Sequence, residues 1–193
     1  MKTSSLQALL IVSAALSCSI SQAAIIQFDL QGTGGIGLLN TNEPGSPVGG
    51  TGGEIGAGIS YDDVANLLTL NVGWGSSQGF TNLSSSLTAA HIHGPTASNN
   101  GAGFTQTSGV AFGLTPSSTT NTGGFFADAP ILFSAGQEID LLNGKFYINI
   151  HTSNNGGGEL RGFLVQAAPE PTSLGLLAVG ALGLLTRRKR QAA

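Results

Sequence analysis

Apolar residues between positions 24 and 168 fall in short runs rich in Val, Ile, Leu and Phe, and Gly, Ser, Thr and Asn fill the stretches between these runs. Short apolar runs bounded by turn-forming residues are typical of β-strands. We therefore expect an all-β domain of about eight short strands. The predicted strands are residues 25–30, 54–61, 67–73, 87–93, 110–114, 124–133, 145–152 and 159–166.

Local signals add turns and one helix to this pattern. Residues 62–66 read Asp-Asp-Val-Ala-Asn and predict a hairpin turn between the second and third strands. Residues 137–143, followed by Gly144, predict one or two helical turns with a C-cap. Eight short strands favour an immunoglobulin-like β-sandwich. The long connections 33–53 and 94–109 are either binding loops or mobile surface, and the sequence leaves both readings open.

The N-terminus has the three parts of a secretory signal peptide. Lys2 supplies positive charge, residues 6–20 are mostly apolar, and Ser21-Gln22-Ala23 offers a small-residue cleavage site. We expect residues 1–23 to be the signal peptide, with cleavage between Ala23 and Ala24. The single cysteine, Cys18, would be removed with it. The mature domain would then have no disulfide, and its stability must come from packing.

The C-terminus, residues 169–193, contains the three parts of a sorting signal in sequence: a Pro-Glu-Pro motif, the apolar residues 174–185, and a basic cluster. Positive charge stays on the cytoplasmic side of a membrane. A permanent span needs about twenty apolar residues. We therefore expect this hydrophobic helix to be a transient inner-membrane anchor that is later removed. A stable transmembrane helix is the alternative. The motif and the cluster are Pro169, Glu170, Pro171, Arg187, Arg188, Lys189 and Arg190.

The segment between the two signals, residues 24–168, has the length of one domain with one core. It holds two basic residues, Lys145 and Arg161, against nine Asp and Glu, which gives a net charge of −7. Nucleic-acid binding depends on the neutralisation of phosphates by Lys and Arg. The charge therefore excludes a nucleic-acid partner, and it leaves cations and neutral or basic partners open.

All three histidines of the chain lie near strand ends. Residues two apart in a strand project to the same side, so His91 and His93 share one face. If the strand that contains His151 is a neighbour, three imidazoles converge, and such a set suits copper or zinc. The alternative is that the histidines hydrogen-bond to one another and to backbone carbonyls, without metal. The sequence alone shows neither a fourth ligand nor partners that would orient the rings.

Two further motifs match known patterns only by their letters. Residues 32–37 (GTGGIG) fit a dinucleotide-binding pattern, but Pro44 and Pro47 interrupt the residues where a helix would have to follow. Residues 75–79 (GSSQG) fit the pattern of a serine nucleophile elbow, but no clear helix follows them. We expect neither a nucleotide site nor a serine hydrolase, and we predict no catalytic residue.

Three segments together resemble the CHRD domain: AHIHGP at 90–95, YINIHT at 147–152 and GELRG at 158–162. The resemblance implies a β-sandwich-like architecture and an extracellular role, and it implies little about chemistry, because the family has no well-established catalytic activity. Glu159 and Arg161 of the last segment lie two apart, hence on one face, and we expect them to pair with polar or charged groups on neighbouring strands.

The C-terminal tail resembles the PEP-CTERM sorting signal of exported bacterial proteins. This resemblance implies that an exosortase-type membrane protease is a partner during sorting. The sequence therefore predicts a secreted or cell-surface CHRD protein of the cell envelope or extracellular matrix, with a binding or structural role. An extracellular polysaccharide or another matrix component is the expected partner, and no cofactor is required.

A more distant resemblance supports an alternative function. A His-x-His strand, a later strand that ends in His and a final strand with Arg are loosely similar to the copper-zinc superoxide dismutase sandwich. That enzyme family uses more histidines, an aspartate and a disulfide, which this chain does not match. The alternative is therefore a copper or zinc binding protein with a single site at His91, His93 and His151, with or without redox activity.

Overall fold

The structure is a computed structural model that describes residues 24–45 and 48–168. The predicted signal peptide, the Pro-Glu-Pro motif, the hydrophobic helix and the basic cluster lie outside these residues. The strands of the described part are β1 (Ile25–Gly32), β2 (Gly35–Ile36), β3 (Leu38–Leu39), β4 (Thr51–Asp62), β5 (Leu67–Trp74), β6 (Leu87–His93), β7 (Val110–Gly113), β8 (Gly124–Phe125), β9 (Ile131–Leu132), β10 (Tyr147–Thr152) and β11 (Leu160–Gln166). The helical segments are η1 (Asn40–Asn42), η2 (Ser76–Gln78), α1 (Asn100–Phe104) and α2 (Ala135–Leu142).

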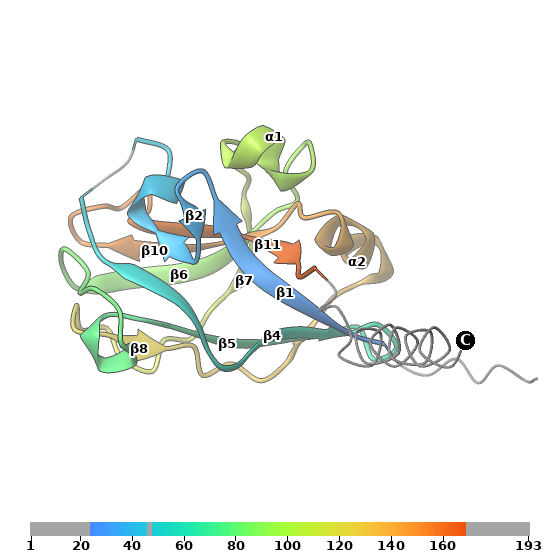
Figure 1. Ribbon diagram of the computed structural model, residues 1–193, viewed down its shortest axis with the longest axis horizontal. Helices are drawn as coiled ribbons and strands as arrows, with labels where there is room; N and C mark the ends of the chain where they lie inside the picture. The colour runs from blue at the N-terminus through green and yellow to red at the C-terminus, as the bar shows by residue number, and fades with distance from the viewer. Residues whose placement is uncertain (1–23, 46–47, 169–193) are drawn as a thin grey trace, which may run out of the picture.

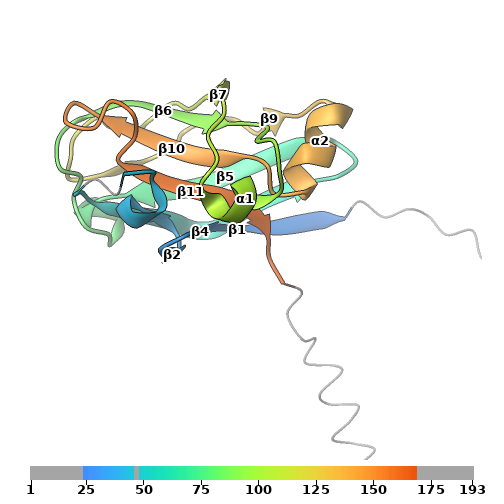
Figure 2. The ribbon, with the colours of Figure 1, turned by 90° about the horizontal axis from the view of Figure 1, so that it is seen from above.

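The strands form two layers, which confirms the predicted all-β sandwich (Figures 1 and 2). One layer contains β11, β10, β6 and β7 in that order, and the other contains β4, β5, β8 and β9. All recorded pairings between strands are antiparallel. Figure 1 shows α2 at one end of the sandwich and α1 on the outer side of the layer that contains β11.

The first strand joins the two layers. Its first half pairs with β4, from Ile25 opposite Asp62 to Phe28 opposite Ile59, and its second half pairs with β11, up to Gln31 opposite Phe163. A second link is the short β3, which pairs with both β4 and β11. The sandwich is therefore one continuous sheet that folds over on itself along β1 and β3.

Strand β4 bends in its middle. Its register with β5 shifts between Glu54 and Ile59, and Gly56 and Gly58 have positive φ angles of 55° and 71°. Only glycine adopts such angles at low cost inside a strand, and bulges of this kind bend a strand and increase its twist. The bend lets one long strand pair with β3 at its start and with β1 at its end.

The core lies between the two layers and is apolar and aromatic. Trp74 on β5 packs against Phe126 with ring centroids 5.3 Å apart and planes tilted by 40°, and Phe133 contacts Tyr61 and Phe146 edge to face. Alternation along the strands selects these residues, because every second side chain faces inward. Burial of such aromatic side chains is the main stabilising contribution in a domain without a disulfide.

The predicted strand at 124–133 is wrong, because the structure has two separate two-residue strands there, β8 and β9. Between them the chain leaves β5: the Ala127 N–H donates to the Thr115 carbonyl, and the Asp128 carboxylate accepts from the Thr115 N–H. Pro130 has no N–H to donate to a ladder. These residues therefore cannot continue the pairing with β5.

The predicted helix is confirmed as α2, which begins two residues earlier than expected. Ser134 is its N-cap and forms a capping box with Gln137: each side chain bonds to the backbone of the other residue. This arrangement satisfies two N–H groups that have no partner within the helix.

The two long connections are structured in part. Residues 33–53 contain β2, β3, η1 and the start of β4. Residues 94–109 contain α1, which is a left-handed turn: φ is positive from Asn100 to Phe104, including the non-glycine Ala102 (53°). This turn packs on β11, where the Phe104 and Phe163 rings meet edge to face at 5.5 Å. The connection therefore covers the outer face of the layer that carries the histidines.

Candidate metal site

The three histidines lie on two neighbouring strands of one layer. Strand β6 pairs with β10, with His93 opposite Tyr147 and His91 opposite Asn149, and His151 lies further along β10. Alternation sends Ala90 and Ile92 of β6 into the core, where both are buried, and sends His91 and His93 to the outer face. The condition under which His151 could join His91 and His93, that their strands are neighbours, is therefore met.

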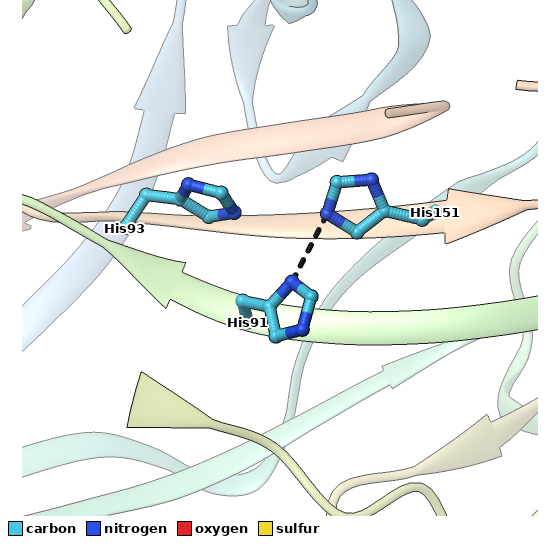
Figure 3. Close-up of side chains that lie close together, drawn as sticks. All are labelled: His91, His93 and His151. Atoms are coloured by element: carbon cyan, nitrogen blue, oxygen red, sulfur yellow. Dashed lines mark hydrogen bonds between the residues drawn. The ribbon is translucent and has the colours of Figure 1, made fainter. Parts of the chain in front are cut away.

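The imidazoles converge on the outer face of the layer (Figure 3). One ring nitrogen from each histidine lies within 4.8 Å of the corresponding nitrogens of the other two. His91 Nδ1 and His151 Nε2 are 3.2 Å apart. A tetrahedral ion about 2.0–2.1 Å from each nitrogen needs nitrogen separations of roughly 3.4 Å. The His91–His151 nitrogen pair, at 3.2 Å, is close to that separation, and the pairs that include His93 are within 4.8 Å.

Backbone carbonyls fix the tautomers of two of the three rings. Nδ1 of His93 lies 2.9 Å from the Ser108 carbonyl oxygen, and Nδ1 of His151 lies 3.0 Å from the Gly156 carbonyl oxygen. A carbonyl only accepts, so each Nδ1 carries the proton and each Nε2 is unprotonated. His91 Nδ1 then donates to the lone pair of His151 Nε2. A metal ion bound by both of these nitrogens would displace that proton, which His91 Nε2 can carry instead. Nε2 of His93 is buried and has no hydrogen-bond partner among the described residues.

The environment of the rings favours their neutral form. Burial lowers the pKa of His93 and of His151, and the neighbouring imidazoles lower both values further, although the carbonyl hydrogen bonds oppose this shift. Neutral imidazole is the form that binds a metal ion. The two rings with carbonyl partners are therefore prepared for ligation near neutral pH.

Tyr147 connects the histidines to Arg161. The His93 and Tyr147 rings are stacked, with centroids 5.0 Å apart and planes at 12°, and the Arg161 guanidinium carbon lies 3.8 Å from the centre of the Tyr147 ring. The Tyr147 hydroxyl accepts from the Ser108 N–H, the residue whose carbonyl orients His93. This stack holds the backbone on one side of the site in place.

Glu159 holds the loops on the other side of the site. Its carboxylate accepts hydrogen bonds from the Gly50 N–H, the Ser84 N–H and hydroxyl, the Thr152 hydroxyl and the Asn155 amide. Asn155 precedes Gly156, whose carbonyl orients His151. The carboxylate therefore supports the loop that fixes one ligand.

The expectation that Glu159 and Arg161 pair with polar or charged groups on neighbouring strands is met in part: Thr152 on β10 is such a partner of Glu159, whereas the other hydrogen-bond partners lie in connections. Glu159 binds the donors described above, and Arg161 Nη2 donates to the Gln106 carbonyl. Both side chains are fully buried.

Sequence reasoning missed the residues that complete this face. Ser108 and Gly156 orient the rings through their carbonyls, and no side-chain pattern marks a carbonyl in a sequence. Glu43 is buried near Arg161, and burial raises its pKa to about 7, although the charge of Arg161 opposes this shift. A Glu within the Gly-rich connection 33–53 gave no sign of burial, because its position depends on contacts far away in the sequence.

The structure also shows where the two glycine-containing motifs lie. The glycine pattern at 32–37 lies in the turn from β1 to β2 and is not followed by an α-helix, and Ser76 begins the single turn η2.

Ala24 is described, and its N–H donates to Asp63. Ala23 and the sorting-signal residues lie outside the described part. Within the described part, no helix has the length and apolar character needed to cross a membrane.

Comparisons with known families identify two parts of the chain. The CHRD domain matches residues 38–164, and the PEP-CTERM protein-sorting motif matches residues 167–190. Neither of these is an enzyme family. The sorting motif implies recognition by exosortase, export, and a cell-surface or extracellular location. No curated protein and no solved structure matches the chain.

Proposed function

The chain belongs to the CHRD domain family, and from this membership we propose that it is a non-enzymatic binding module of the bacterial cell surface or extracellular matrix. Its ligand in this proposal is one copper or zinc ion, held by His91, His93 and His151. Before release, the precursor is held transiently in the inner membrane by its C-terminal hydrophobic segment.

One observation supports the metal proposal above the others: two of the three converging rings have their tautomers fixed by carbonyls. Metal-binding histidines almost always donate their second N–H to such a partner, which sets the orientation of the ring and of its lone pair. Histidines that only hydrogen-bond to one another would not need His93 Nε2 to be buried without a partner. An ion would satisfy this nitrogen.

The donor set favours copper or zinc over harder cations. Three imidazoles suit copper and zinc, whereas calcium and magnesium prefer oxygen ligands. The cluster contains no carboxylate or thiol within the part of the chain that the structure describes. Three protein ligands leave one tetrahedral position for water or for a donor from a partner. Such a site binds an ion without the larger ligand set of the dismutase family.

Metal analysis of the purified domain tests this proposal. Residues 24–168 are incubated with copper or zinc, freed of excess metal, and analysed by mass spectrometry. We expect about one ion per chain in the natural sequence and almost none in the His91→Ala/His93→Ala double variant. Thr88→Ala, an exposed position on β6, is the matched control and should retain the ion. Equal metal content in the double variant and the control would disprove the site.

A second candidate ligand is an extracellular polysaccharide, which a groove of about 430 Å³ beside β1 and β4 favours. Phe80, Asp29 and Glu54 line the groove, together with Gly52 and Gly53, which have no side chains. An aromatic ring can pack on a sugar face, and carboxylates accept hydrogen bonds from hydroxyls. Electrophoresis through gels that contain neutral polysaccharides should show retardation that Phe80→Ala abolishes. Unchanged migration of the natural sequence in dextran, galactomannan and β-glucan gels would remove this candidate.

A further inference from the structure

Apolar residues on β1, β5 and β9 lie on the outer face of the sheet at one end of the sandwich, on both sides of Asp62 on β4. Ile25 on β1 pairs with Asp62 on β4, Asp62 pairs with Leu67 on β5, and Leu67 pairs with Leu132 on β9. Directly paired residues project to the same face of a sheet. Ile25 and Leu132 are 57% and 66% exposed, and Val64 in the adjoining turn is 64% exposed. We call Ile25, Val64, Leu67 and Leu132 the terminal patch.

The concentration of apolar surface at this end is unusual for the molecule. Of the eight large apolar side chains that are strongly exposed among the described residues, Ile25, Val64 and Leu132 belong to the terminal patch, and Ile139 lies on α2 at the same end (Figure 1). A grouped apolar surface of this kind marks an interaction site more often than isolated apolar residues do.

The described chain also ends at this end of the sandwich. Gln166, the last residue of β11, pairs with Phe28, and the Ala167 N–H donates to the Gln27 carbonyl. Ala168 therefore lies beside the first residues of β1, and the terminal patch begins at Ile25. The match to the sorting motif begins at Ala167, a residue that is still bonded to β1.

The distance from this end to the membrane is limited by chain length. Only residues 169–173 separate Ala168 from the apolar segment that begins at Leu174. Such a link spans at most about 20 Å when fully extended. In a precursor anchored by residues 174–185, the end that carries the terminal patch must lie next to the membrane surface. A protease that recognises residues 169–171 must approach the same end.

The charge beside the patch distinguishes two kinds of partner. Asp62, Asp63 and Glu138 lie at this end. Of the basic residues in the described chain, Lys145 is the closest to Glu138 in sequence, and it is paired with Asp140. Anionic lipids repel such an acidic rim. A protein surface with apolar groups and with Lys or Arg at its edge is complementary to it.

We propose that the terminal patch is the surface by which the folded precursor docks on the exosortase-type protease that processes its tail. The proposal rests on the proposed membrane anchoring of the precursor. Docking raises the time that residues 169–171 spend at the protease, since the patch and the motif are joined by a short link. The folded domain is then part of the substrate, together with the motif.

Pulse-chase labelling of the full chain, in cells that carry the protease, tests the proposal. The patch variant is Val64→Ser/Leu132→Ser, and the control is Ile36→Ser/Phe125→Ser, which changes exposed apolar residues outside the patch. We expect conversion of precursor to the mature form to slow by about fivefold or more in the patch variant. The control should convert at the natural rate. Glu138→Lys, which leaves the apolar side chains in place, should also slow conversion.

The outcomes separate the docking proposal from the anchoring on which it rests. Equal conversion of patch variant and control, with the precursor in the membrane fraction, would overturn docking alone. A natural precursor that is absent from the membrane fraction would overturn both proposals. A patch variant that leaves the membrane fraction before cleavage would mean that the patch binds lipid, contrary to the proposal. Should the double variant fail to fold, the Glu138→Lys result decides the question.

Discussion

Glu43 and Arg161 are two opposite charges that the fold buries without a direct salt bridge between them. Glu43 is 9% exposed, and its Oε2 atom has no hydrogen-bond partner among the described residues. The same holds for Nε and Nη1 of the fully buried Arg161, although its Nη2 atom bonds to Gln106. A buried carboxylate without partners is costly when ionised, which explains why the pKa of Glu43 is raised to about 7.

This position predicts a stability that depends on pH. The pKa of Glu43 is higher in the folded state than its usual value of 4.5, so the stability that it contributes is fully present below 4.5 and is lost as pH rises to about 7. Glu43→Gln removes this loss because the amide stays neutral. We expect the variant to be more stable than the natural sequence by about 2–3 kcal/mol at pH 8.

Denaturant unfolding of the metal-free domain at several pH values measures the difference. Near pH 4.5 the gain in stability should disappear, since Glu43 in the folded natural sequence is then largely neutral, like the Gln side chain of the variant. Glu138→Gln, on the surface of α2, is the control and should show no comparable gain. A variant that is no more stable at pH 8 would show that Glu43 is not a destabilising charge.

Metal binding should depend on pH through the histidines. Burial lowers the pKa of His93 and His151, so both rings stay neutral to a lower pH than a histidine in water, whose pKa is about 6.5. We expect metal affinity to hold from pH 8 to about 6.5 and to fall at lower pH, as protons displace the ion. Titrations with zinc at each pH check this order. Affinity that stays constant at pH 4 would contradict ligation by imidazole.

At the scale of elements, Glu159 links the connections before β4, before β6 and between β10 and β11. Burial alone would raise the pKa of Glu159, but hydrogen bonds from Ser84, Thr152 and Gly50 lower it below the usual value. Its stabilising contribution is therefore present above about pH 4.5 and is lost as pH falls through the lowered pKa. This one buried carboxylate therefore holds the three connections together.

Glu159→Gln should loosen this end of the sandwich. The amide nitrogen of Gln cannot accept a hydrogen bond, so at least one of the donors from Gly50, Ser84 or Thr152 loses its partner. We expect a loss of about 2–4 kcal/mol in the free energy of unfolding. Metal affinity should fall as well, because the loop with Gly156 is released. Thr88→Ala is again the control, and unchanged stability of Glu159→Gln would contradict the role of this carboxylate.

The elements that could be predicted from the sequence are those that alternation defines. Strands with regular inward and outward positions, such as β5 and β6, match their predicted ranges closely. The two-residue strands β2 and β3 gave no signal, because two residues contain no period. The break at Pro130 was missed because apolar residues stand on both sides of it. The left-handed turn α1 was missed because Ala102 and Phe104 rarely adopt positive φ.

The same reasoning explains what could be predicted of the site. The spacing of His91 and His93 placed both on one face, and the shared face with His151 depended only on strand order. The groups that orient the rings belong to the loops at 94–109 and 153–158, which fold back on the strands through contacts distant in sequence. No local pattern contains such contacts.

At the scale of the whole molecule, a bound ion should stabilise the domain. The three ligands come from β6 and β10, so unfolding separates them and releases the ion. Metal at a hundred times its Kd adds about 2.7 kcal/mol to the free energy of unfolding. This corresponds to a rise in Tm of roughly 5–10 °C for a domain of this size. Calorimetry with and without zinc measures the rise, and an equal rise in His91→Ala/His93→Ala would place the ion elsewhere.

The pairing of β1 with β11 has a consequence for the time at which the domain can fold. A chain that is exported from its N-terminus delivers Phe28 early and Gln166, its partner, almost last. Until then half of β1 has an open edge, and the two layers cannot close around the core. The fold can therefore be complete only after the whole domain has crossed the membrane. In the proposed route to the cell surface, the Pro-Glu-Pro motif at residues 169–171 would therefore become accessible only when the domain before it can be complete.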